Sequence, residues 1–169
     1  MNAAAEELGL TEAGAALGLF LRSHRVLFDE IDRELQEEMG LSFPLWEVLA
    51  VLAQARGDRL RMVDVTRRMC VSKSNVTQLI DKLEESELVA RVSSKTDRRL
   101  TFVRLTKRGV RAAQRGVEIF NAAADEHFAR YMNDEEVRRI ASGLMKVLKG
   151  LEPESVPVTS DRIGALAPS

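Results

Sequence analysis

The chain has 169 residues, 45% of them hydrophobic and 30% charged, and its 25 Lys and Arg against 26 Asp and Glu leave a net charge of −1. This length suits one domain, or one domain with an appended arm, and can bury a core without disulfides or metals. The single cysteine, Cys70, excludes an internal disulfide, and two histidines give no usual zinc site. No apolar run could span a membrane and no signal-peptide pattern is present, so we expect a cytoplasmic protein. We also expect no metal and no cofactor.

The positive charge is concentrated in one stretch of the chain. Residues 59–111 contain 14 Lys and Arg but only 6 Asp and Glu, so this segment carries +8 and the remainder −9. Such an imbalance is typical of a face that meets a polyanion, and equally of a solvated basic surface. Charge alone leaves both interpretations open.

The first predicted element is a long amphipathic helix that ends near Met39. One face recurs at the three-and-four spacing of a helix, through Leu17, Phe20, Leu21, His24, Leu27, Phe28, Ile31 and Leu35. Gly40 follows at a position where a helix end favours a residue that can adopt a positive φ.

A short buried helix is predicted over residues 45–55, because nearly every residue there is apolar. Ser42 can cap free amides and Pro44 is tolerated in a first turn, so both mark the start of this helix. After a break at Gly57, a third helix is expected over 62–69.

A fourth helix is predicted from Ser72, which is placed as its N-cap. Val76, Ile80 and Leu83 give this helix one apolar side. Its other side is small, polar or basic near the start, and its acids are confined to the C-terminal end. The first turns of this helix can therefore approach phosphates.

The pattern then changes to a period of two. Residues 89–93 and 100–105 predict two strands of a hairpin with a charged tip over 94–99. Thr106 is placed to cap a long helix, and Asn133 to cap a last one with Glu136 reaching back to it.

A helix, a turn, a second helix and a charged hairpin form the layout of a winged helix-turn-helix. The sequence resembles the MarR (multiple antibiotic resistance regulator) family of bacterial transcription factors. The segments that carry the resemblance are Leu45-Trp46-Glu47-Val48-Leu49, Ser72-Lys73-Ser74-Asn75-Val76-Thr77, Leu88-Val89-Ala90-Arg91, Asp97-Arg98-Arg99 and Leu105-Thr106-Lys107-Arg108-Gly109. Glu87 departs from the family, which usually has Gly there, so we expect a strained or differently shaped helix end.

The resemblance implies a mainly α fold with a small β-hairpin wing, in which a winged lobe is joined to a helical dimerisation region. The expected units are an arm and first dimerisation helix (1–41), the DNA-binding lobe (42–106), two dimerisation helices (107–151) and a flexible or partner-docking tail (152–169). The apolar stripes of the long helices are too rich for one small lobe to cover, which also favours a homodimer. A monomeric helical bundle is the alternative.

The expected partner is double-stranded DNA with an inverted repeat. Amides and small hydroxyls of the fourth helix suit base edges, and these are Ser74, Asn75, Thr77 and Gln78. Three residues are better placed for phosphates: Ser72, Lys73 and Lys82. At the wing tip, the family motif implies that Asp97 orients Arg99 for the minor groove, with Lys95 and Arg98 on phosphates. Each could instead lie on a solvated surface.

We expect a repressor that a small aromatic or anionic effector releases, because family members often respond in this way. The candidate pocket residues are His24, Phe28 and Trp46, each of which could equally be core or interface. A redox switch at Cys70 is one alternative, although a lone cysteine between apolar residues is more often inert. A winged-helix protein-interaction module is another. No catalytic motif is visible, so an enzyme is not expected.

Overall fold

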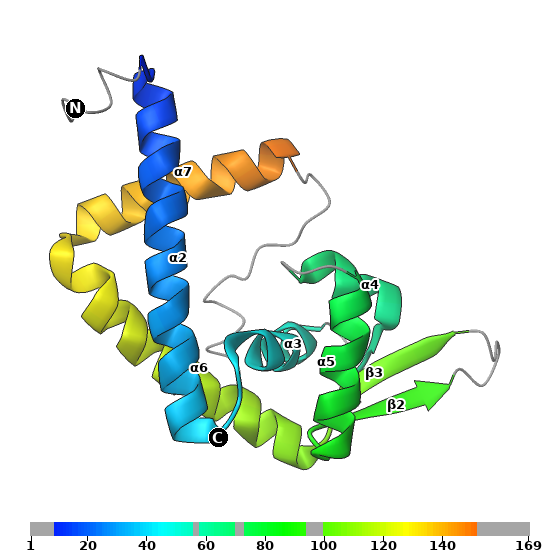
Figure 1. Cartoon of the computed structure of the whole chain (residues 1–169). Helices are drawn as coiled ribbons and strands as arrows, with labels where there is room; N and C mark the ends of the chain where they lie inside the picture. Colours follow the sequence, from blue (N-terminus) through cyan, green and yellow to red (C-terminus); the bar gives the residue numbers. More distant parts are fainter. Residues whose placement is uncertain (1–8, 56–57, 70–72, 94–99, 152–169) are drawn as a thin grey trace.

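The computed structural model describes residues 9–55, 58–69, 73–93 and 100–151. Long helices form a scaffold, and short helices with a small sheet form a lobe beside it, from which a hairpin projects (Figure 1). The elements are α2 Glu12–Met39, α3 Phe43–Ala53, β1 Leu60–Arg61, α4 Met62–Arg68, α5 Lys73–Glu85, β2 Val89–Ser93, β3 Thr101–Leu105, α6 Lys107–His127, η1 Ala129–Tyr131 and α7 Asp134–Leu151. The predicted mainly helical fold with a winged lobe is confirmed.

The junction between α2 and α3 contains one confirmed and one wrong prediction. Gly40 ends α2 with φ 67°, and its amide donates to the Gln36 carbonyl. Ser42, however, makes no side-chain cap to α3; Oδ1 of Asp32 instead accepts the Phe43 amide at 2.6 Å. A carboxylate from the neighbouring helix makes a stronger bond to a helix N-terminus than a hydroxyl does, so α3 starts at Phe43, two residues earlier than expected.

The sheet has three antiparallel strands in the order β1-β3-β2. The predicted hairpin is present, with Val89 opposite Leu105 and Ser93 opposite Thr101. Strand β1 was not predicted, and its two residues pair with Phe102 and Val103 of β3. This extra pairing supports the hairpin, since two strands alone are only marginally stable.

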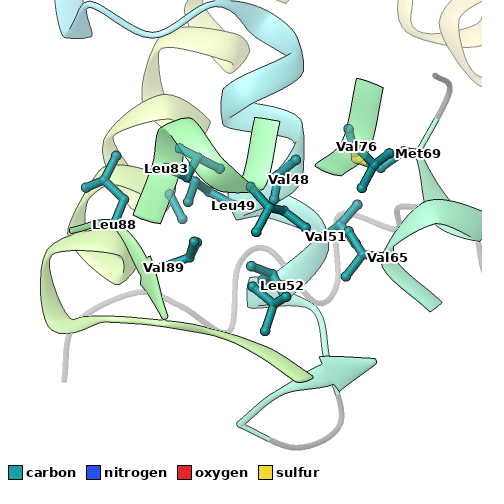
Figure 2. Close-up of a cluster of buried hydrophobic side chains, with 13 residues drawn as sticks. Val48, Leu49, Val51, Leu52, Val65, Met69, Val76, Leu83, Leu88 and Val89 are labelled. Carbon is teal, nitrogen blue, oxygen red and sulfur yellow. The ribbon is translucent and has the colours of Figure 1, made fainter. Parts of the chain in front are cut away.

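One apolar cluster fills the winged lobe (Figure 2). Val48 and Leu49 of α3 pack with Leu83 of α5, and all three side chains are almost fully buried. A second cluster joins α3 to the scaffold through Leu35 of α2 and Ile119 of α6. Helix α3 is therefore the shared wall between the lobe and the long helices.

The start of α6 lies against the turn that joins α5 to β2. As predicted, Thr106 caps α6: its Oγ1 accepts the Gly109 amide at 3.0 Å. The Thr106 amide also donates to the Leu88 carbonyl at 3.0 Å. A Cβ added at Gly109 would collide with that carbonyl, so only glycine permits this close approach.

The last helix, α7, begins with the predicted capping box. Oδ1 of Asn133 accepts the amides of Glu135 and Glu136 at 3.0 and 3.1 Å, and Oε2 of Glu136 accepts the Asn133 amide at 2.9 Å. None of the α7 residues is buried, and Val147 and Leu148 are exposed. In the described part of the chain, no helix combines the length and apolar character needed to cross a membrane.

Candidate nucleic-acid interface and pocket

Helix α5 has one apolar, buried side and carries polar side chains on its other faces, the arrangement that a DNA-reading helix needs. Val76 and Ile80 are completely buried in the lobe, whereas the polar side chains on its other faces are exposed. The exposed predicted residues are Asn75, Thr77, Gln78 and Lys82. Lys73 and Ser74 belong to the first turn of α5, but their side chains, and all of Ser72, lie outside the described residues. Spacings of three and four place Asn75, Gln78 and Lys82 in one line along the helix.

Arg91 fastens the wing to α5. Its guanidinium forms ion pairs of 2.6 Å with both Asp81 and Glu84, and its backbone amide donates to Oε1 of Glu84 at 2.9 Å. The strand β2 is therefore held against the C-terminal half of α5. The same contacts offset one of the two negative charges that Asp81 and Glu84 bring to the helix that carries the candidate DNA-reading residues.

Arg91 stays positively charged within this cluster. Partial burial on its own would lower the pKa of the guanidinium, but hydrogen bonds and charge attraction from Asp81 and Glu84 raise that pKa above its ordinary value. The cluster therefore stays ion-paired as long as the two carboxylates are ionised.

The turn between α5 and β2 has the geometry that a glycine would normally supply. Glu87 has φ 57°, in the left-handed region, and the amides of Glu87 and Leu88 return to the carbonyls of Glu84 and Leu83. This is a Schellman ending, so the helix end keeps the shape that glycine would give, and of the two expectations for Glu87 the strained one fits, because a non-glycine residue is left-handed. An ion pair of 2.9 Å from Glu87 to Arg108 spans the turn.

The predicted wing-tip residues lie outside the described part of the chain: Lys95, Asp97, Arg98 and Arg99. At the described base of the wing, the guanidinium of Arg59 stacks on the Phe102 ring at 4.7 Å from its centroid. Arg59, directly before β1, and Arg104 of β3 are exposed cations that the sequence prediction did not select. Both lie in the basic segment of the sequence, but the pairing of β1 with β3 is what brings them close together.

A pocket of about 400 Å³ lies between the scaffold and α3. The predicted residues His24 and Phe28 line it, together with four phenylalanines that the sequence did not mark as a group: Phe20, Phe43, Phe120 and Phe128. The four-residue spacing of Phe20, His24 and Phe28 on α2 was a readable signal for one wall. The other walls come from α3, from α6 and the residue that follows it, and from α7, and they meet only in the folded chain.

Trp46, the third predicted pocket residue, lies behind the pocket wall. Its ring stacks on Phe120 with centroids 5.1 Å apart and meets Phe43 at 5.6 Å. Only 4% of Trp46 is exposed, and its Nε1 donates to the Ala113 carbonyl at 3.3 Å. The indole is thus one ring away from the pocket, with its polar atom satisfied.

Cys70, the candidate redox residue, lies outside the described residues. Among the residues that the structure describes, no group of three His, Cys, Asp or Glu side chains is arranged to hold a metal ion.

Comparisons with known proteins agree with this architecture. A sequence profile of the MarR family matches residues 39–100. A proposed transcriptional regulatory protein for the hcr operon of Thauera aromatica is 30% identical over 140 residues, which are 82% of this chain and 82% of that protein.

Two solved structures share the fold. One is Sco3205, a MarR family regulator from Streptomyces coelicolor in complex with DNA, with a TM-score of 0.76 and 23% identity over 86% of this chain and 91% of that one. The other is Bordetella bronchiseptica BpsR, whose DNA binding is regulated by 6-hydroxynicotinic acid, with a TM-score of 0.70 and 22% identity over 79% and 98%.

Proposed function

This chain belongs to the MarR family of transcriptional regulators, and from that premise we propose that it is a homodimeric repressor of an inverted-repeat operator, released by a small molecule. Its place is then the cytoplasm, with the DNA that it binds. The assignment of 42–106 as the DNA-binding lobe, and of 1–41 and 107–151 as the dimerisation region, is part of this proposal.

The observation that carries the proposal is the exposed face of α5. Asn75 and Gln78 offer amides that match the hydrogen-bonding edge of adenine, and Lys82 offers a phosphate contact one turn further on. The Arg91 cluster offsets part of the negative charge of two neighbouring acids and holds the wing beside the helix. A rigid, polar helix face beside a basic hairpin suits the major groove.

The wing tip has a separate role in the proposal. Arg99, oriented by Asp97, would enter the minor groove, and Lys95 and Arg98 would contact phosphates, as the family resemblance implies. Narrow minor grooves concentrate negative potential and attract arginine. These contacts would make affinity strongly dependent on salt.

Exposed apolar side chains support the dimer. They gather on the first half of α2 and on α7: Leu17, Leu19, Phe20, Leu21, Val26, Ile140, Leu144, Val147, Leu148 and Leu151. A monomer would leave this surface in water, whereas a second copy would bury it. Two-fold symmetry would place two α5 helices in successive major grooves, about 34 Å apart.

The effector part of the proposal rests on the aromatic pocket. It lies between α2, α6 and α7 of the scaffold and α3 of the lobe, so a bound molecule would touch both parts. A molecule that binds one lobe position more tightly than another shifts the population toward it. Release of DNA follows if the favoured position no longer matches the operator spacing.

The test is a fluorescence-anisotropy titration of the full chain with the DNA that flanks its own gene, at two salt concentrations, with a scrambled duplex as control. We expect saturation at one dimer per site, with affinity at least about 1000-fold above that for the scrambled duplex. Equal binding to both duplexes, together with an empty genome-wide pull-down, would contradict the proposal and favour a protein-interaction module.

A further inference from the structure

The aromatic pocket has a composition that selects its ligand by charge. We infer that it takes an uncharged aromatic molecule rather than an organic anion, an inference that rests on the effector role proposed above. Five phenylalanines contribute to its lining: Phe20, Phe28, Phe43, Phe120 and Phe128. They come from α2, α3 and the α6 region, so rings face the cavity from several sides.

These rings are arranged to hold another ring. Phe28 meets Phe43 edge to face with centroids 5.1 Å apart, and Phe43 lies 6.3 Å from Phe120 at a tilt of 34°. Aromatic pairs at these separations prefer offset or edge-to-face contact, and each adds to the gain from apolar burial. A planar ligand would find both geometries within one cavity.

The lining offers no cation to an acidic ligand. Among the described residues that line the pocket, none is Lys or Arg, and the side chains with polar groups are Ser23, His24 and Glu47. An organic anion would have to give up its hydration in a mainly apolar cavity. An uncharged molecule carries no such cost.

The nearby cation lies in a different hollow. Arg22 and His127 line a second depression of about 560 Å³, which shares Ser23, Phe128 and a few apolar residues with the pocket. His127 is already hydrogen-bonded to Glu34 at 2.6 Å. Arg22 lines this second hollow and is not among the residues that line the aromatic pocket.

One residue can recognise a polar substituent of the ligand. The His24 ring lies between Phe20 and Phe28, with centroids 6.4 and 6.1 Å away. A neutral imidazole can both donate and accept a hydrogen bond, so it suits an amide or a hydroxyl. The volume of about 400 Å³ is at the small end of ligand sites, which favours a compact molecule of one or two rings.

The experiment uses three probes that share one skeleton and differ in charge near neutral pH: 4-tert-butylbenzamide, 4-tert-butylbenzoate and 4-tert-butylbenzylammonium. Binding to the full chain is measured by calorimetry and by the emission of Trp46, the single tryptophan, which stacks on Phe120 of the pocket wall. We expect the amide to bind at least about tenfold more tightly than either ion. Equal or tighter binding of the benzoate or the ammonium, or no binding of the amide, would overturn the inference.

Two exposed residues locate the binding. His24→Ala should weaken the amide about two- to tenfold through the lost hydrogen bond, whereas Arg22→Ala, in the neighbouring hollow, should leave its affinity unchanged. The reverse pattern would place the ligand in the other hollow and contradict the assignment. The probe titrations contain no DNA and are therefore independent of operator binding. If the amide binds but the operator does not, only the repressor proposal is overturned. If the operator binds but the amide does not, only this inference is overturned.

Discussion

The indole of Trp46 lies directly against the backbone of Gly116, so closely that a Cβ at position 116 would collide with the ring. This contact joins α3 of the winged lobe to α6 of the scaffold. The indole also donates its Nε1 proton to Ala113, one turn earlier on α6. The two helices are thus fixed to each other beside the aromatic pocket.

Gly116→Ala is therefore expected to destabilise the fold although alanine is the better helix former. The added methyl group forces the indole to shift, and we expect a loss of about 1–3 kcal/mol in the free energy of unfolding, measured by urea denaturation. Gly143→Ala is the matched control, since nothing lies within 4 Å of a Cβ there. That variant should be up to about 1 kcal/mol more stable. Equal stabilisation by both changes would contradict the packing described for Trp46.

Glu87→Gly is expected to stabilise the protein. A left-handed residue other than glycine costs about 1 kcal/mol, and the ion pair that would be lost, to Arg108, is exposed and contributes little. Thermal denaturation should show a higher Tm for this variant. The control, Glu85→Gly, removes a charge from the last turn of α5, where no positive φ is needed, and should lower the Tm. A lower Tm for Glu87→Gly would exclude relief of strain at this turn.

Sequence predicted the helix ends that depend on local chemistry. Gly40, Thr106 and the pair of Asn133 and Glu136 act as expected, because caps of these kinds involve residues only a few positions apart. The fold class followed from the periodicity and from the order of the motifs.

Features that depend on distant residues could not be predicted in this way. Asp32 replaces Ser42 at the start of α3 because the chain brings α2 beside it, eleven residues away in sequence from Phe43. Strand β1 has only two residues and exists through its partner β3. The pocket is similar: Phe43 and Phe120 meet only after α3 packs on α6.

Arg91→Ala is expected to weaken DNA binding about tenfold without direct contact to DNA. The change removes both side-chain ion pairs that hold the wing to α5 and leaves Asp81 and Glu84 without this cation, so that they would repel phosphates near the helix. Adding Glu84→Gln to this variant should restore part of the affinity in an anisotropy titration. Arg139→Ala, which removes an exposed pair with Glu135 on α7, should bind as the wild type does. An unaffected Arg91→Ala variant would show that the cluster does not support DNA binding.

Leu148→Glu is expected to convert the proposed dimer into a monomer. Leu148 is an exposed apolar residue of α7, and a buried unpaired carboxylate at a dimer interface costs several kcal/mol. Light scattering after size exclusion should give the mass of two chains for the wild type and of one chain for the variant. Lys146→Glu, on the same helix, places the same acid at an already polar position and should remain dimeric. A dimeric Leu148→Glu variant would exclude this part of α7 from the interface.

If α5 reads base sequence, Gln78→Ala should abolish the recognition of one base pair. Anisotropy titrations would compare wild type, this variant and Asn121→Ala, an exposed change on α6, on the operator and on duplexes with one base pair altered. When one particular A·T pair of the half-site is changed, we expect the wild type and Asn121→Ala to lose about tenfold or more in affinity. Gln78→Ala should bind the operator and that altered duplex equally. If Gln78→Ala keeps full discrimination at every position, helix α5 does not read the operator through this residue.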